Sequence, residues 1–500
     1  FNPQNISNTL LSLNQMGLTL LNLSVGLQRG LLDSVESNIK RFKPQEISIT
    51  LLSLNQMGLD WSNLSVELQR GLLASVESNM KQFNPQDISN TLLSLNKMGL
   101  IWSSLSVELQ RGLLASVESN MREFNPQNIS NTLLSLNQMD VIWSNLSDGL
   151  QRGLLASVEY NMRGFNPQGI SNTLLALNQM GLAWSSLSGD LQRGLLASVE
   201  YNMREFSPQN VSNTLLALSR MLVLDKRLEL LLVTRAIELK QEIAHDELSV
   251  RQICLALTWI QAYSDREYPQ LNEGLRPILS ITESRLQQEV SHLLQSIFPN
   301  IISEHGLGVN GVISVDCFIP TNCIVEVHGP SHYNLDGSLN HKSIEQKQLL
   351  EKMGYNVKIV SYEDWKHFKS DDDKLSYIRS LISGVSSDRA SVNSTSNASV
   401  EIVVANNEQS DEEYTFGLID SDSRVNSADI VETAEVDNGK SNEESSDEEY
   451  TFGLIDSDSR VNSADIVETA EVDNGKSNEE SSDEEYTFGL IDSDSRVNSA

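Results

Sequence analysis

Four polar side chains stand close together within residues 315–365 and are of types that carry out chemistry. Asp316 and Glu326 each lie in a short apolar segment that reads as a buried strand, and His328 and His332 follow around a Gly-Pro turn. Isolated charges are costly to bury, so carboxylates at the ends of adjacent buried strands do not help to fill a core. These four residues are therefore the first candidates for binding or catalysis.

The elements around these side chains predict a small α/β domain. An amphipathic helix over 283–298 carries Glu289, and two strands then end at Phe318 and Val327. A helix over 337–353, a strand over 355–362 and a helix over 371–381 complete the order. We expect a compact unit with one sheet over residues 283–384.

The first half of the chain is an internal repeat with a period of 41 residues. Its marker is a phenylalanine followed two positions later by Pro-Gln, at Phe1, Phe42, Phe83, Phe124, Phe165 and Phe206. Asn2 before Pro3 predicts a capped helix start, and Gly17 predicts the end of that helix. A second amphipathic helix follows in each copy. Such hairpins must stack on their neighbours to bury their apolar faces, so residues 1–245 predict an all-α solenoid.

The remaining boundaries follow from changes in pattern and charge. Residues 246–282 resemble a degenerate capping repeat and a linker, and residues 385–500 form an acidic tail with 36-residue repeats. Residues 1–245 carry 18 Lys+Arg against 20 Asp+Glu, whereas the tail carries 6 against 30. The tail contains few apolar residues, so we predict that it is disordered.

Two rows of cations follow the period of the array. Arg29, Arg70, Arg111, Arg152 and Arg193 form the first row, and an unpaired row of this kind could follow a phosphate backbone. A solvated helix face is the alternative. The second row is Lys40, Lys81, Arg122, Arg163 and Arg204, and each of its cations lies four residues after a Glu. That spacing favours ion pairs within a helix, so we expect the second row to be structural.

Polar residues on the first helix of each repeat could read bases. One row consists of Asn8, Asn90, Asn131, Asn172 and Asn213, interrupted by Ile49. A neighbouring position varies among Asn5, Glu46, Asp87, Asn128, Gly169 and Asn210 on an almost constant scaffold. Repeat proteins that take one base per unit vary such positions. Drift at a solvated first turn is the alternative. The tryptophans Trp61, Trp102, Trp143 and Trp184 are interpreted as packing between repeats.

A family resemblance becomes visible at this point. Residues 324–332, with Glu326, the Gly-Pro turn and His332, together with Lys347 and Trp365, resemble the RAP domain, an RNA-associated module. The 41-residue repeats are similar to octotricopeptide-type helical repeats, which often precede RAP domains.

The resemblance implies a fold and a possible reaction. RAP domains are thought to share the core of the PD-(D/E)xK, or restriction-endonuclease-like, nucleases. In such a site Asp316 and Glu326 would be catalytic and would hold Mg²⁺ or Mn²⁺, with Glu289 as a third carboxylate. His328 occupies the position of the nuclease lysine, and Lys347 could take that role. His332 could donate to a phosphate; a structural hydrogen bond to the turn is the alternative.

The other bulk features set limits on function. The cysteines Cys254, Cys317 and Cys323 form no zinc or disulfide pattern, so we expect them to be small core residues. No apolar run is long enough to cross a membrane. The tail could dock a protein partner through its serines, which could be phosphorylated, and through Tyr414, Phe416 and Leu418.

Three functions remain open at this stage. The primary hypothesis is a protein that recognises single-stranded RNA and acts in RNA processing, stability or translation. The others are a metal-dependent endoribonuclease and a protein-binding solenoid, such as an effector of an intracellular bacterium. The family precedent favours a mitochondrion or chloroplast, with a bacterial cytoplasm or delivery into a host as alternatives. The sequence starts with Phe1 rather than Met, so a preceding targeting segment stays open.

Overall fold

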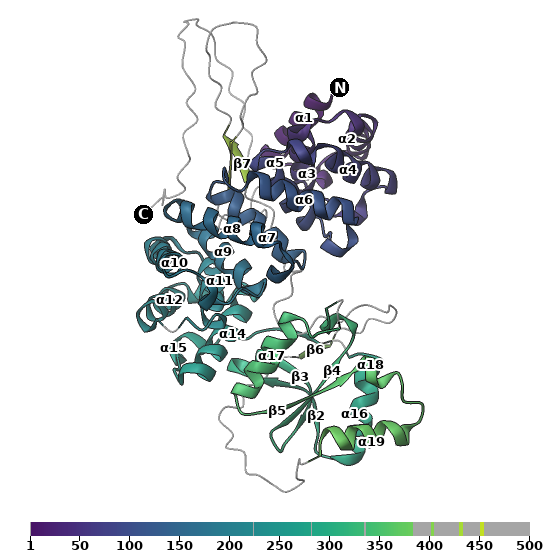
Figure 1. Cartoon of the computed structure of the whole chain (residues 1–500), viewed down its shortest axis with the longest axis vertical. Coiled ribbons are helices and arrows are strands. Elements are labelled where there is room, and N and C mark those ends of the chain that lie inside the picture. The colour runs from purple at the N-terminus through teal and green to yellow at the C-terminus, as the bar shows by residue number, and fades with distance from the viewer. Residues whose placement is uncertain are drawn as a thin grey trace, which may run out of the picture. The chain divides into compact units, whose positions relative to one another are not determined.

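The computed structural model describes residues 2–223, 225–281, 283–334 and 337–383 and three short strands beyond them (Figure 1). These strands are β6 (Ile402–Val404), β7 (Ile430–Thr433) and β8 (Thr451–Leu454). β6 pairs in parallel with β1 (Leu279–Ile281), and β7 pairs antiparallel with β8. All of these residues belong to one compact unit, Phe1–Asp458. Apart from the three strands, the predicted disordered tail lies outside the described residues.

Six helical hairpins make up the array within the described residues. Their first helices are α1 (Pro3–Gln15), α3 (Pro44–Gln56), α5 (Pro85–Lys97), α7 (Pro126–Gln138), α9 (Pro167–Gln179) and α11 (Pro208–Arg220). Their second helices are α2 (Val25–Asn38), α4 (Val66–Asn79), α6 (Val107–Asn120), α8 (Asp148–Asn161), α10 (Gly189–Asn202) and α12 (Lys226–Glu238). The all-α repeat array predicted from the 41-residue period is therefore present.

The residues predicted to start and end the first helix do so in the structure. The Asn2 side chain accepts a hydrogen bond from the backbone N–H of Asn5 at 2.7 Å, and Pro3 opens α1. Gly17 has a φ of +71°, a left-handed conformation in which a helix ends without a Cβ clash. The sixth copy places Leu222 at the same position with a φ of +56°, which a branched side chain adopts only with strain.

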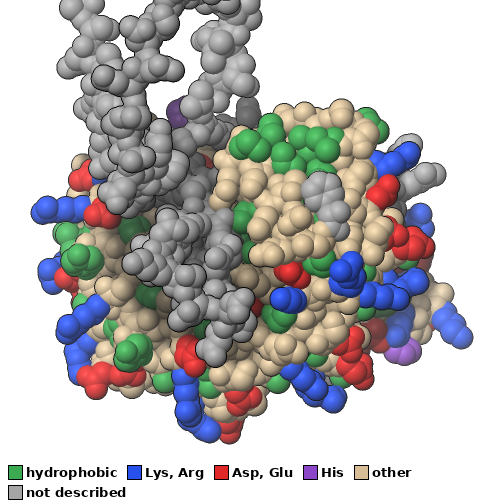
Figure 2. Space-filling view, turned by 90° about the horizontal axis from the view of Figure 1, so that it is seen from above, with side chains coloured by type: hydrophobic (Ala, Val, Ile, Leu, Met, Phe, Trp, Pro, Cys, Tyr) green, Lys and Arg blue, Asp and Glu red, His purple; other side chains and the backbone are tan. Residues whose placement is uncertain are grey.

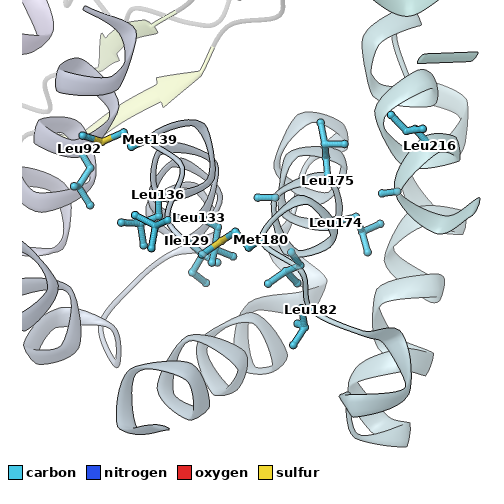
Figure 3. Close-up of a cluster of buried hydrophobic side chains, with 14 of the residues drawn as sticks. Leu92, Ile129, Leu133, Leu136, Met139, Leu174, Leu175, Met180, Leu182 and Leu216 are labelled. Carbon is cyan, nitrogen blue, oxygen red and sulfur yellow. The ribbon is translucent and has the colours of Figure 1, made fainter. Parts of the chain in front are cut away.

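Consecutive repeats are joined by hydrogen bonds that recur with the period. The backbone N–H of Trp61 donates to the carbonyl of Met98 in the next repeat at 2.8 Å. Within a repeat, Asn120 Nδ2 donates to the carbonyl of Phe83, where that repeat begins, at 2.9 Å. Between these bonds the first helices stack side by side on a continuous apolar core (Figure 3). Trp143 is buried and Trp61, Trp102 and Trp184 pack partly buried against this core, which supports their interpretation as packing residues.

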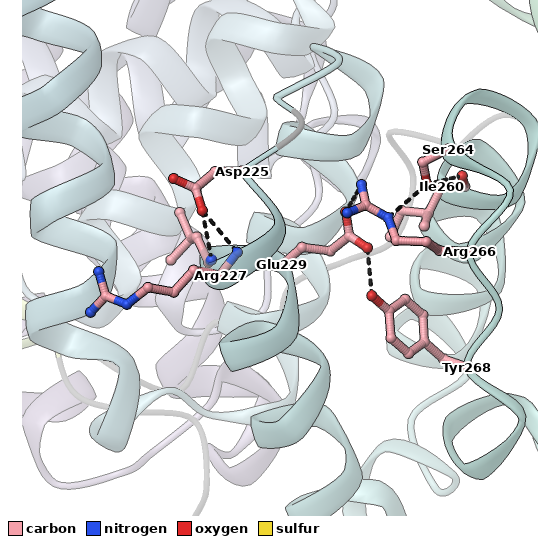
Figure 4. A network of polar contacts seen from close by, with 8 residues as sticks. Asp225, Arg227, Glu229, Ile260, Ser264, Arg266 and Tyr268 are labelled. Carbon is pink, nitrogen blue, oxygen red and sulfur yellow. Dashed lines mark hydrogen bonds and ion pairs between the residues drawn. The ribbon is translucent and has the colours of Figure 1, made fainter.

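The array continues past its sixth copy into a short closing segment, formed by α13 (Lys240–Ile243), α14 (Glu247–Ser264) and α15 (Pro269–Asn272). α14 packs on α11 in the way that the first helix of another repeat would. Glu229 ties α12 to the connection after α14, because its carboxylate pairs with Arg266 at 2.9 Å and accepts a bond from Tyr268 Oη at 2.6 Å (Figure 4). Burial and this carboxylate raise the pKa of Tyr268 to about 12.

The C-terminal domain is built on one four-stranded sheet with the order β2-β3-β4-β5. The strands are β2 (Ile302–Leu307), β3 (Ile313–Ile319), β4 (Cys323–His328) and β5 (Asn356–Ser361). The first three run antiparallel, and β5 is parallel to β4. The helices are α16 (Arg285–Ile297), α17 (His341–Lys352), α18 (Tyr362–Trp365) and α19 (Asp371–Leu381).

Helices cover both faces of this sheet (Figure 1). α16 and α19 pack on the face that carries Cys317 and Val325, whereas α17 contacts β5 and α14. The predicted helices and strands are present, but the sequence reading missed β2. That strand, ISEHGL, has no clear alternation of apolar and polar residues, so the pattern did not distinguish it from a loop.

Two bulk predictions can be compared with the structure. The three cysteines are free and buried, as expected for core residues. Among the described residues, no helix combines the length and the apolar character needed to cross a bilayer.

Candidate functional site

Asp316 and Glu326 form a buried acidic pair at the centre of the sheet. Their exposed fractions are 4% and 2%. Asp316 Oδ2 accepts a hydrogen bond of 2.6 Å from the backbone N–H of Val327, the residue after Glu326, so β3 and β4 fix the two carboxyls together. Burial raises the pKa of both groups well above their ordinary values, and the charge of Asp316 raises the pKa of Glu326 further. We therefore expect the Asp316–Glu326 pair to retain a proton.

A third acid, which the sequence reading missed, joins this pair. Glu304 lies on β2 opposite Asp316, has a φ of +53° and stands outside the regular pairing of β2 with β3. Its carboxylate accepts hydrogen bonds from Ser314 Oγ at 2.7 Å and from Gln287 Nε2 on α16. Its charge raises the pKa of Asp316 and of Glu326. The register of β2 against β3 is the same on both sides of Glu304, so the residue stands opposite Asp316 with a locally left-handed backbone, which the residue pattern does not indicate.

Glu289, expected as the third carboxylate, points elsewhere. One of its oxygens accepts a bond from Trp365 Nε1 at 2.9 Å, and the other pairs with Lys374 on α19. The acids whose charges act on Asp316 are Glu304 and Glu283, and Glu289 is not one of them. The expected role of Glu289 is therefore corrected: the residue fastens α16 to α19.

The two histidines stack on each other beside α17, with ring centroids 4.2 Å apart. Both are buried, and burial lowers the pKa of His328 to about 3 and that of His332 to about 4. They are therefore neutral at pH 7. His332 Nδ1 lies 3.0 Å from Ser343 Oγ, which places the ring against α17. Lys347 is half-exposed, lies 3.7 Å from Glu351 and adds to the lowering of the pKa of His328.

Hydrogen bonds among the described residues engage part of the acidic cluster and leave one oxygen of Glu326 open. One oxygen of Glu326 accepts from Gln346 Nε2 at 3.4 Å, and its Oε2 is buried without a hydrogen-bond partner in the described part of the chain. Asp316 has already committed Oδ2 to Val327. No group of three or more His, Cys, Asp or Glu side chains in the described residues is arranged to hold a metal ion. Binding of Mg²⁺ or Mn²⁺ stays a prediction, and we derive no catalytic step from it.

The two polar rows on the first helices are buried, which corrects the prediction that they read bases. Ser48 Oγ donates to Asp87 at 2.9 Å, and Asn128 Nδ2 donates to Ser89 Oγ at 3.1 Å, in each case across consecutive repeats. The buried members of the rows are Asp87, Asn90, Asn128, Asn131, Gly169, Asn172, Asn210 and Asn213, and Glu46 is half-buried. Only Asn5 and Asn8, on the first described helix, are exposed. The first helices pack too closely together to leave these side chains accessible.

The first arginine row is accessible. Arg29, Arg70, Arg111, Arg152 and Arg193 are all exposed, one on each of the second helices α2, α4, α6, α8 and α10. Arg193 pairs with Asp190. In the described part of the chain, no carboxylate lies within ion-pair distance of the other four arginines. The array therefore presents a cation at one fixed position per repeat.

The second cation row is accessible too, and the predicted ion pairs within the helix are wrong. α2, α4, α8 and α10 end at Asn38, Asn79, Asn161 and Asn202, and a tight 3-10 turn carries the cation that follows. The α-helical spacing that would bring each Glu next to the cation four residues later is lost at that point. Glu200 pairs instead with Arg227 at 3.0 Å. Figure 2 shows Lys and Arg side chains interspersed with Asp and Glu on the face seen from above. The five cations of the second row are all exposed and recur with the period of the array.

Two family models match parts of the chain. Residues 325–381 match the model of the RAP domain. A second model, described as a protein of unknown function (DUF1601), matches the array at residues 1–10, 26–51, 57–92, 102–133, 142–174 and 181–215. No curated protein matches the chain.

The chain thus carries a segment that matches the RAP domain, after an N-terminal array of helical repeats. RAP domains are associated with RNA binding, and the repeats fit an array-type binder. The similarity of the repeats to the octotricopeptide type stays a prediction.

Proposed function

We propose that this protein binds single-stranded RNA along its helical array, acts in RNA processing, stability or translation, and uses its RAP domain to contact the same RNA. The RAP match supports RNA as the ligand. The array supports a strand rather than a compact ligand, because a stack of similar repeats offers an extended surface.

The observation that carries the proposal is the exposed arginine row. Each arginine sits at the same position of a second helix, and α2, α4, α6, α8 and α10 follow one another along the array. Neighbouring packed helices lie about 8–10 Å apart, so the row offers one cation at that interval. Phosphates bind such cations independently of base sequence. Since the two polar rows are buried, selection among sequences must come from other groups.

A selection experiment tests the proposal on the full chain. The protein is incubated with a randomised single-stranded RNA pool, with and without Mg²⁺ or Mn²⁺, and the retention and the fragment length of the RNA are recorded together. We expect retained, intact RNA. Reversing Arg70, Arg111 and Arg152 to Glu should abolish retention, whereas the matched Lys triple should keep most of it because the charge is preserved. Equal retention by the Glu and Lys triples would contradict the proposal.

The endoribonuclease reading has one observation in its favour, the unpartnered and buried Oε2 of Glu326. Metal-dependent fragments in the same experiment, absent with Asp316→Ala, would establish it. The protein-binding reading predicts that RNA is not retained at moderate salt. The geometry of the acid pair favours the binding module over the nuclease, because a phosphodiester cannot reach carboxylates that are almost fully buried.

A further inference from the structure

Two tyrosines are exposed at equivalent positions of consecutive repeats. Tyr160 on α8 and Tyr201 on α10 are 87% and 84% exposed and lie 41 residues apart. They are the first tyrosines in the sequence and the only two in the six repeats. α8 and α10 contact each other, so the two side chains belong to adjacent helices of one face (Figure 1).

Neither ring contributes visibly to the fold. The same position holds Ser37, Ser78 and Ser119 in the first three repeats, where it is exposed as well. Ser and Tyr have similar helix propensities, so helix formation does not require the change. A large aromatic side chain left in solvent at one register, twice in succession, is typical of a binding surface rather than of a packing position.

The neighbours of each tyrosine along its helix are small or charged, and Glu159 and Glu200 immediately precede Tyr160 and Tyr201. Ala156 and Ala197 lie four residues earlier, exposed on the same side of the helix, and leave one side of each ring uncrowded. Arg163 and Arg204 follow three residues after the tyrosines and are exposed. Arg152 and Arg193, from the first arginine row, lie eight residues before them, about 12 Å along the helix axis.

We infer that Tyr160 and Tyr201 are stacking platforms for two bases of a single-stranded RNA whose phosphates follow the flanking arginines. This inference rests on the proposed function and adds to it the part of the array that holds bases. An unpaired base of any identity can stack on an aromatic side chain. This site therefore supplies affinity and tolerates variation in the RNA sequence. A protein partner is the other ligand for exposed Tyr and Arg, but a protein hot spot is surrounded by occluding contacts, and the rings here have small and charged neighbours.

The experiment uses the full chain, and the chain itself supplies matched variants. Tyr160→Ser with Tyr201→Ser converts the fourth and fifth repeats to the residue of the first three. The probes are a mixed-sequence single-stranded RNA and an RNA of equal length whose central nucleotides lack bases. Circular dichroism melting should be unchanged. We expect the dissociation constant for the intact RNA to rise by roughly twenty-five-fold or more, since each of the two stacked bases contributes on the order of a fivefold factor or higher.

Two further readouts separate stacking from charge. The double variant and the wild type should bind the RNA without bases equally, and the slope of log Kd against log salt should not change, because no phosphate contact is removed. Ser78→Tyr with Ser119→Tyr should tighten binding of the intact RNA. If the wild type binds RNA and the Tyr→Ser variant binds it equally well, the inference is wrong while the proposed function stands. If the wild type retains no RNA, both fail.

Discussion

Asn128 Nδ2 donates a hydrogen bond of 3.1 Å to Ser89 Oγ, and these two residues lie 39 positions apart on the first helices of consecutive repeats. The variable position on the first helix is thus a joint between repeats. Asn128 Oδ1 also accepts from the backbone N–H of Asn125 at 3.2 Å and so caps its own helix. Variation at this position tunes how neighbouring repeats fit together, whereas the exposed second helices present the groups that a ligand can reach.

Asn128→Ala should destabilise the array without altering RNA selection. The variant removes the hydrogen bond to Ser89 Oγ and the bond from the backbone N–H of Asn125, each worth about 0.5–1.5 kcal/mol. Chemical denaturation measures this loss, and Asn5→Ala, at the exposed equivalent position, is the control. A changed sequence preference in the selected RNA, with normal stability, would restore the base-reading role.

Leu222→Gly should stabilise the end of the array. Leu222 adopts a left-handed φ of +56° and is 42% exposed, so little packing is lost on substitution. Relief of the left-handed conformation is worth roughly 1–2 kcal/mol, offset by about 0.4–1 kcal/mol for the greater freedom of Gly in the unfolded chain. We expect a small rise in the melting temperature. Gly181→Ala, the reverse change at a natural Gly with a φ of +87°, should lower it.

Glu326→Gln should stabilise the protein increasingly as pH rises. The raised pKa values of Asp316 and Glu326 mean that the folded state keeps a proton which the unfolded state releases above the ordinary values of 3.8 and 4.5. Wild-type stability therefore falls as pH rises through the window above these values. The glutamine amide does not titrate, so the stability of the variant should fall less steeply as pH rises. Denaturation curves from pH 4.5 to 8 measure the effect, with exposed Glu351→Gln as the control; parallel curves for all three proteins would contradict it.

Arg220→Ala should destabilise the junction between the array and the RAP domain. Arg220, at the end of α11, pairs with Glu345 on α17, and both side chains are almost fully buried. Removing one partner of a buried pair costs about 3–5 kcal/mol, because the other charge stays buried. Arg220→Met combined with Glu345→Leu should recover most of the loss. Thermal unfolding of the two variants tests this, and equal melting temperatures would show that the pair is not coupled.

The sequence predicted the features that depend on local signals and period. Asn2, Pro3 and Gly17 act as expected because caps and left-handed ends are local properties. The burial of Asn90 and Asn131 could not be read from the chain, because it depends on how closely neighbouring first helices approach. An asparagine facing a groove and one facing a neighbour have the same periodicity.

The candidate site, too, could be predicted from the sequence only in part. Asp316 and Glu326 lie together as their strands required, whereas Glu289 pairs with Lys374 and Glu304, for which the sequence analysis predicted no role, stands opposite Asp316. The side-chain partner of Glu289 and the left-handed backbone of Glu304 depend on tertiary packing, which has no signature in one sequence. The nuclease-like fold and any cation site stay predictions.

The salt dependence of RNA binding tests the central claim most directly. The dissociation constant of the full chain for one selected RNA is measured across salt concentrations for the wild type, for the Glu triple at Arg70, Arg111 and Arg152, and for the Lys triple. Each phosphate contact removed should reduce the slope of log K against log salt by about one. We predict a reduction of roughly two to three for the Glu triple, with weaker binding, and a nearly unchanged slope for the Lys triple. Equal slopes and affinities for all three proteins would show that the arginine row does not hold RNA.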